Sequence, residues 1–143
     1  MSGIVEAIHT SPRKSVLPTP VPEVAVTEQG VVGDRYGEAG DVTLVEAEAL
    51  EALAEETGIE LTAAEVRRQV LTRGVRLNDL LGKRFRVGEV LCHGEEWCEP
   101  CNHLQSLTKP GVLKGLVHRG GLRAQIVEGG RIAVGDSVTA DGA

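Results

Sequence analysis

The most reactive residue types in this sequence stand close together. Cys98 and Cys101 are separated by two residues, Trp97 precedes them and His103 follows. Two thiols at this spacing can form a redox pair, bind a metal or simply pack beside a loop. A redox pair of the thioredoxin type requires a βαβ pattern around the motif, and the chain lacks one. Thiolates also bind soft or high-valent metals, so a metal site has to be weighed.

Zinc is the first metal to consider for these residues. Cys98, Cys101 and His103 could bind it, with Cys92 or His93 as a fourth ligand. However, a structural zinc site usually joins two separated ligand pairs, and these candidates are near neighbours in the chain. A structural zinc site in a small interaction module therefore stands as the alternative.

A single thiolate that holds a metal within an anionic organic cofactor fits the surrounding residues better. Such a site needs glycines for close approach and cations for a phosphate. Gly120 and Gly121 lie between two arginines downstream of the cysteines, and further charged residues lie upstream. The charged candidates are Arg119 and Arg123, with Asp34, Arg35, Arg67 and Arg68.

The charges are unevenly distributed along the chain. Residues 1–66 carry 3 basic and 13 acidic side chains, whereas residues 67–131 carry 12 basic and 6 acidic ones. The basic section contains the cysteine pair, which favours an anionic ligand there. Nucleic acid is disfavoured as a partner, because the net charge is −6 and only 2% of residues are aromatic.

Length and composition predict one domain over residues 1–143. With so few aromatic residues, the core must consist of Val, Leu, Ile and Ala. No apolar run approaches the roughly 20 residues that a membrane helix needs. The N-terminus does not resemble a signal peptide, and three cysteines are odd in number for a disulfide framework. We therefore expect a cytoplasmic protein with reduced thiols.

Periodicity and turn residues predict a mainly β fold with flanking helices, of the α+β class. The 18 glycines and 6 prolines are typical of a small barrel or curled sheet with helices outside. The expected strands cover residues 3–9, 23–27, 41–45, 69–73, 84–87, 89–93, 122–128, 131–134 and 137–139. The expected helices cover residues 46–57 and 110–118, with short helical pieces near 62–65 and 104–107. Residues 10–22 are expected to form a loop or an extended segment that cannot pair as a central strand, residues 30–37 a loop, and residues 78–82 a turn.

Several short motifs, in order along the chain, resemble the MOSC family, named for the C-terminal domain of molybdenum cofactor sulfurases. The resemblance is strongest over residues 28–138 and includes Cys98-Glu99-Pro100-Cys101 and Gly120-Gly121-Leu122-Arg123. The matching pieces cover residues 30–35, 42–48, 67–70, 81–88, 98–101, 118–124 and 128–136.

The resemblance implies a MOSC-type β-barrel that binds the molybdenum cofactor (molybdopterin). It also implies that Cys101 is the metal ligand or carries a persulfide. Gln69 stands where relatives usually have asparagine, and Tyr36 stands where many have histidine. The expected cofactor-binding residues are Asp34, Arg35, Arg68, Cys101, His118, Arg119 and Arg123.

Two functions follow from the resemblance. The protein could be a small oxidoreductase of N-hydroxylated substrates, or a carrier of cofactor or of sulfur bound to Cys101. Either role needs separate partner proteins that donate electrons or persulfide.

Overall fold

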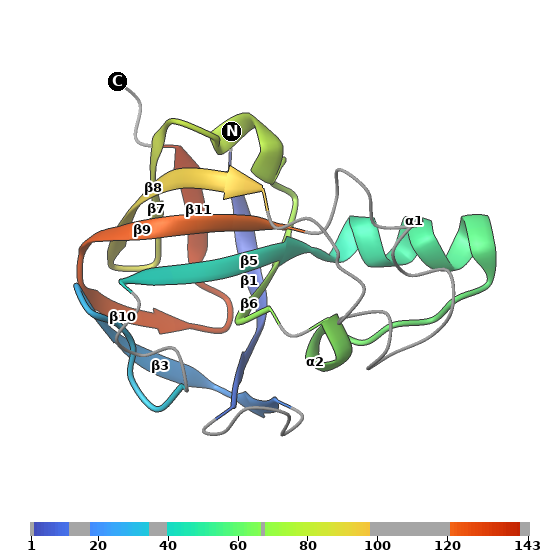
Figure 1. The fold of residues 1–143 in the computed structure, drawn as a ribbon, viewed down its shortest axis with the longest axis horizontal. Helices are drawn as coiled ribbons and strands as arrows, with labels where there is room; N and C mark the ends of the chain where they lie inside the picture. Colours follow the sequence, from blue (N-terminus) through green and yellow to red (C-terminus); the bar gives the residue numbers. More distant parts are fainter. Residues whose placement is uncertain (1, 12–17, 35–39, 67, 98–120, 141–143) are drawn as a thin grey trace.

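The structure is a computed structural model that describes residues 2–11, 18–34, 40–66, 68–97 and 121–140. Within these residues, strands dominate and two α-helices follow β5 (Figure 1). The strands are β1 (Ser2–Thr10), β2 (Thr19–Val21), β3 (Glu23–Thr27), β4 (Gly30–Val31), β5 (Asp41–Glu46), β6 (Val70–Arg73), β7 (Arg84–Val87), β8 (Val90–Trp97), β9 (Leu122–Glu128), β10 (Gly130–Ala133) and β11 (Ser137–Ala140). The helices are α1 (Ala47–Thr57), α2 (Ala63–Val66) and the 3₁₀ turn η1 (Leu77–Leu80).

Seven strands form a closed barrel. Their order is β11-β7-β8-β9-β5-β6-β1, and pairing of β1 with β11 completes the ring. Every neighbouring pair is antiparallel except β5 and β6, whose connection through α1 and α2 is long enough for a parallel crossover. The prediction of a mainly β barrel with flanking helices is confirmed. A second, three-stranded sheet consists of β10, β3 and β4.

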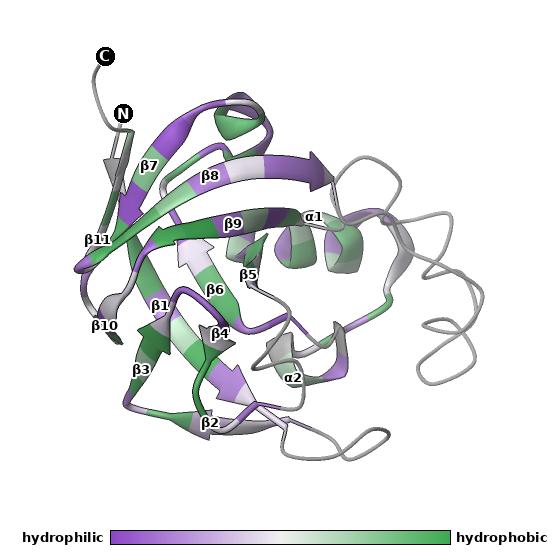
Figure 2. Cartoon of the chain, turned by 60° about the vertical axis from the view of Figure 1, so that its left-hand side comes forward, coloured by the Kyte–Doolittle hydropathy of each residue, from purple (hydrophilic) through white to green (hydrophobic). Residues whose placement is uncertain are grey.

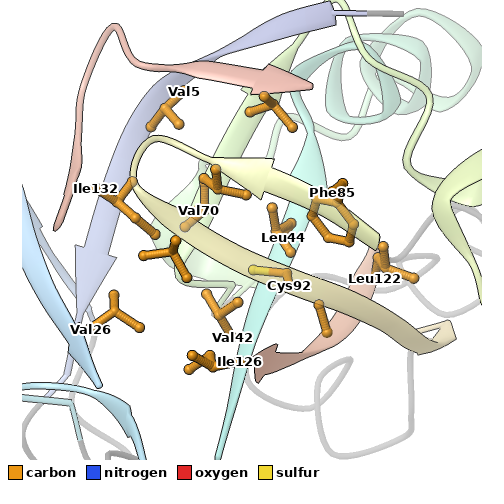
Figure 3. Close-up of a cluster of buried hydrophobic side chains, with 14 of the residues drawn as sticks. Val5, Val26, Val42, Leu44, Val70, Phe85, Cys92, Leu122, Ile126 and Ile132 are labelled. Atoms are coloured by element: carbon orange, nitrogen blue, oxygen red, sulfur yellow. The ribbon is translucent and has the colours of Figure 1, made fainter. Parts of the chain in front are cut away.

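The barrel interior is filled by apolar side chains from alternating strand positions (Figure 3). Val42 and Leu44 of β5 point inward, as do Leu122, Ala124 and Ile126 of β9. This core is almost entirely aliphatic, as the composition predicts. Because side chains fill the interior of a barrel of this size, a ligand must bind outside it.

Helix α1 covers the outer face of β5 and β6. Its Leu50 and Leu53 form a second buried cluster with Val45 and Leu61. The helix ends at Gly58, which has a φ of 75° and donates its N–H to the Ala54 carbonyl at 2.8 Å. As a result, β5 is buried on both faces where it meets α1.

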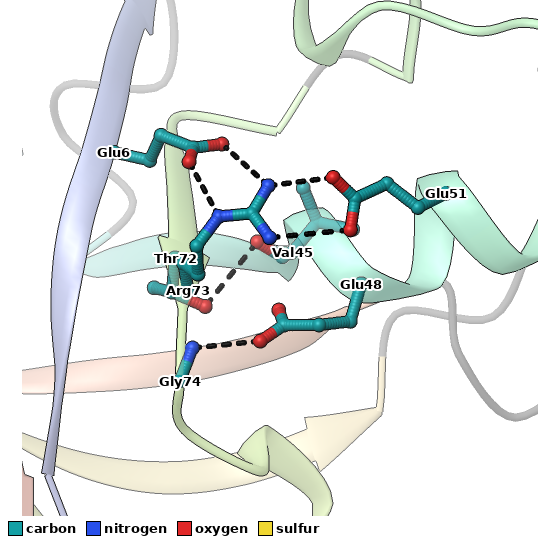
Figure 4. A network of polar contacts seen from close by, with 7 residues as sticks. All are labelled: Glu6, Val45, Glu48, Glu51, Thr72, Arg73 and Gly74. Atoms are coloured by element: carbon teal, nitrogen blue, oxygen red, sulfur yellow. Dashed lines mark hydrogen bonds and ion pairs between the residues drawn. The ribbon is translucent and has the colours of Figure 1, made fainter.

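Polar contacts fasten α1 to the neighbouring strands (Figure 4). Arg73 of β6 pairs with Glu6 of β1 and Glu51 of α1, each at 2.6 Å. Glu48 accepts a hydrogen bond from the backbone N–H of Gly74 at 2.7 Å. These contacts fix α1 against the barrel at the C-terminal end of β6.

Strand β2 lies at the edge of the sheet, within the stretch predicted as a loop or an extended segment that cannot pair as a central strand, so this prediction is confirmed and Pro20 is tolerated there. Two other predictions were wrong. Strand β4 lies in the predicted 30–37 loop. Strand β8 continues to Trp97, beyond the predicted end, as a hydrophilic extension without the alternating burial of a half-buried strand (Figure 2).

Other predictions are confirmed or lie outside the described residues. Helix α1 and strands β3, β7 and β9 match their expected ranges closely. The predicted turn after residue 77 contains η1. The helices expected near residues 104–107 and 110–118 lie outside the described residues. Within the described part of the chain, no helix is long and apolar enough to cross a membrane.

Candidate functional site

Asp34 is held in a defined orientation just after β4. Its Oδ1 accepts a hydrogen bond from the backbone N–H of Ser11 at 2.8 Å. Its Oδ2 accepts a second hydrogen bond from Nε2 of Gln69 at 3.0 Å. Residues from two distant parts of the chain therefore fix the carboxylate of this predicted cofactor residue.

Gln69 is buried and is anchored on Thr43 of β5. Its Oε1 accepts hydrogen bonds from the Thr43 backbone N–H at 2.9 Å and from Thr43 Oγ1 at 3.4 Å. Its backbone N–H donates to Thr43 Oγ1 at 3.0 Å. Ser11, Asp34, Thr43 and Gln69 are called the Gln69 network below. The glutamine that replaces the usual asparagine thus has well-defined partners.

Gly121 lies beside Arg68 at the end of β5. Its φ of 115° is unfavourable for other residues, and a Cβ on it would clash with the Leu44 carbonyl oxygen. The same Cβ would lie 3.4 Å from Nε of Arg68, so the guanidinium group runs close to this glycine. Leu44 pairs with both Leu122 and Val70, which places Gly121 near the start of β6.

Both ends of the segment that carries the cysteine pair therefore lie at this place. Trp97 precedes residues 98–120 and pairs with Leu122, while Gly121 follows them. The predicted site residues Arg35, Cys101, His118 and Arg119 lie outside the described residues, as do Cys98 and His103. The described structure places Arg68 at the anchor points of the cysteine segment, and the adjacent Gln69 binds the carboxylate of Asp34.

Arg123 lies one strand away and has acidic partners. Arg123 of β9 pairs in register with Thr43 of β5. Its guanidinium group forms an ion pair with Glu96 and lies 3.7 Å from Asp41. Burial raises the pKa of Asp41, and the charge of Arg123 opposes this shift. Arg123 is thus near the Gln69 network in register, but its side chain is engaged with carboxylates.

A shallow hollow of about 760 Å³ lies on the outer face of β8 and β9. Arg123 and the acidic residues of the β8 extension form one part of its wall. The hollow is lined by Leu81, Gly82, His93, Gly94, Glu95, Glu96, Arg123 and Gln125. It adjoins the end of β8 from which the cysteine segment begins.

His9 of β1 is half-buried and lies next to Gln69. Its backbone N–H donates to the Gln69 carbonyl at 2.8 Å. Its Nδ1 is buried and has no hydrogen-bond partner among the described residues, and burial lowers the pKa of the ring. The sequence gives no signal for this position, because the proximity of His9 to the network follows from the β1–β6 register.

Cys92 lies in the barrel core, and burial raises the pKa of its thiol to about 12. A thiol buried inside the barrel is not available as an external ligand, which removes Cys92 as a candidate for the fourth zinc ligand. Among the described residues, no group of three or more His, Cys, Asp or Glu could hold a metal ion.

A closed barrel with a filled interior, and with polar side chains held on its outer side, describes a small barrel protein with a candidate site outside the barrel. The chain belongs to the MOSC domain family, whose family model matches residues 33–139. The sequence prediction of this family is thereby confirmed.

Solved structures share the fold at low sequence identity. YuaD from Bacillus subtilis superimposes with a TM-score of 0.86 at 14% identity, covering 98% of this chain and 96% of that one. YiiM from Geobacillus stearothermophilus gives 0.79 at 21% identity, covering 98% and 75%. YiiM from Escherichia coli gives 0.77 at 19% identity, covering 100% and 71%. The search of curated proteins found no match.

Proposed function

We propose that this protein binds a molybdenum cofactor, with Cys101 as the ligand of the metal or of a transferable sulfur. In this proposal residues 1–143 act as one domain in the reducing cytoplasm, where Cys101 remains a thiol. The observation that carries the proposal is that Arg68 lies beside Gly121, where the two ends of the segment that contains Cys101 meet, while the adjacent Gln69 binds the carboxylate of Asp34.

The chemistry of these residues fits an anionic pterin cofactor. Arg68 can bind a phosphate through a planar guanidinium group. The carboxylate of Asp34 accepts hydrogen bonds, which suits the N–H groups of a pterin ring. Gly121 allows the backbone to approach closely without a side chain in the way. A thiolate at Cys101 is a suitable ligand for a soft or high-valent metal.

The remaining predicted residues complete the proposed site. Arg35, His118 and Arg119 belong to it through the family resemblance. Asp41 and Glu96 partly balance the charge of Arg123, which weakens the contribution of Arg123 to phosphate binding. When bound, the cofactor would supply two-electron redox chemistry or sulfur at the metal.

Metal analysis tests the proposal. The protein is produced in a host that makes the cofactor, and molybdenum and zinc are measured per chain. We expect close to one molybdenum per chain, which is lost in Cys101→Ala. Cys92→Ala is the matched control, because it removes a thiol inside the barrel and should retain the metal. Stoichiometric zinc without molybdenum would favour the structural zinc module and overturn the proposal.

A second assay separates the two roles of a loaded protein. Reduction of an N-hydroxylated test compound with a chemical electron donor indicates an oxidoreductase that needs a donor protein in the cell. Absence of turnover, together with a persulfide on Cys101 detected by mass spectrometry, indicates a carrier that needs a persulfide donor.

A further inference from the structure

The side-chain amide of Gln69 has only one chemically sensible orientation. Its oxygen must face the backbone N–H of Thr43, 2.9 Å away, and its nitrogen must face the Asp34 carboxylate, 3.0 Å away. The reversed amide would place N–H against N–H and oxygen against carboxylate. The amide therefore links β5 to Asp34 through one acceptor and one donor that cannot exchange.

The backbone of Gln69 is fixed as firmly as its side chain. Its N–H donates to Thr43 Oγ1 at 3.0 Å, and its carbonyl accepts the N–H of His9 at 2.8 Å. The side chain itself is buried, with an exposed fraction of 7%. A fixed backbone and a fixed amide oxygen leave Nε2 at one position, so the glutamine determines where Oδ2 of Asp34 lies.

The length of the side chain matters for this link. An asparagine, the residue usual at this position in the family, is shorter by one methylene, or roughly 1.5 Å. If its oxygen kept the Thr43 N–H, its nitrogen would fall short of the Asp34 carboxylate. The glutamine side chain therefore has the length needed to reach from Thr43 of β5 to Asp34.

We infer that Gln69 is the positioning residue of the proposed cofactor site, which orients the Asp34 carboxylate toward the cofactor. The inference rests on the proposed function and adds to it a residue that acts through Asp34. The consequence is that cofactor affinity depends on a hydrogen-bond donor at this position and not only on a residue that fills the space.

Gln69→Glu tests the donor. One oxygen of the introduced carboxylate still accepts the Thr43 N–H, while the other faces Asp34 as a like charge. At pH 8 we expect affinity for isolated molybdenum cofactor to fall about tenfold or more, since a charge-assisted hydrogen bond is replaced by repulsion. As the pH falls toward 5, a proton bound between the two carboxyl groups restores a donor, and the difference from wild type should shrink.

The readout is molybdenum retained per chain after equilibrium dialysis across this pH range. Gln29→Glu is the matched control, because Gln29 is an exposed residue of the turn between β3 and β4 and the variant adds the same charge. A merely structural role would change the melting temperature without this pH-dependent recovery. Gln69→Asn is an uncharged second variant, which tests the positioning role of Gln69 if Gln69→Glu does not fold.

The outcomes separate the two proposals. If wild type binds the cofactor and both folded variants bind it equally well at every pH, the positioning role is wrong while the proposed function stands. If wild type itself takes up no cofactor, both fall together. Weakened binding by Gln69→Asn, with the fold retained, supports the required side-chain length.

Discussion

His9 is a titratable residue whose burial beside the Gln69 network affects its protonation. The residue is half-buried beside the backbone of Gln69, and within the part of the chain that the structure describes its Nδ1 has no hydrogen-bond partner. Burial disfavours the protonated ring and lowers its pKa from the ordinary value of 6.5. An unfolded chain binds a proton at that ordinary value, so over some range below pH 6.5 the unfolded state binds more protons than the folded one.

This difference predicts the direction of a pH effect on stability. The contribution of His9 to stability should be fully present above pH 6.5 and should decrease as the pH falls through that value. We expect His9→Leu to flatten the fall of the melting temperature between about pH 7.5 and pH 5.5. Thermal denaturation at several pH values checks this. An unchanged slope in the variant would show that another group causes the dependence.

At the scale of elements, β5 connects the parts of the site. Its inner face contributes to the barrel core, its C-terminal end packs under α1, and Thr43 anchors Gln69. The Leu44 carbonyl is so close to Gly121 that no side chain fits there. The start of β9, and with it one end of the cysteine segment, is therefore fixed against β5 by a glycine.

Gly121→Ala tests this close approach. Its matched control is Gly58→Ala, because Gly58 also has a positive φ, of 75°, but has open space around its Cβ position. We expect Gly58→Ala to cost about 1–2 kcal/mol of unfolding free energy from backbone strain alone. Gly121→Ala adds a clash with the Leu44 carbonyl and should cost about 4 kcal/mol or more. Urea denaturation measures both, and equal costs would contradict the steric account.

The sequence predicted elements better than it predicted their contacts. Alternating apolar residues gave β3, β7 and β9, and the apolar stripe with Gly58 gave α1. The charged extension of β8 was missed because its exposed residues carry no alternation. Asp34 and Arg68 were singled out as charged candidates from the residues themselves, and the family resemblance then supported both. Thr43 and Ser11 were not, because their place in the site depends on strand register, which no local pattern specifies.

At the scale of the whole molecule, the residues that fill the barrel core are separate from the residues of the candidate site. Its interior is closed by the β1–β11 pairing and filled by aliphatic side chains. The polar groups of the candidate site lie outside, where the ends of β5, β6 and β9 meet. This arrangement predicts that substitutions in the barrel core change stability, whereas substitutions in the Gln69 network change ligand binding.

Phe85 is the strongest test of the core, because it is the only phenylalanine of the chain and its side chain is fully buried. Phe85→Ala removes most of that volume from a closed barrel that can relax only slightly, so we expect a loss of about 3–5 kcal/mol in unfolding free energy. Phe85→Leu keeps an apolar side chain of similar size and should cost less than about 1.5 kcal/mol. Chemical denaturation measures both variants, and molybdenum content per folded chain should equal that of wild type in Phe85→Leu. A small loss in Phe85→Ala, or lost metal in a stable Phe85→Leu, would show that core and site are coupled through the barrel wall.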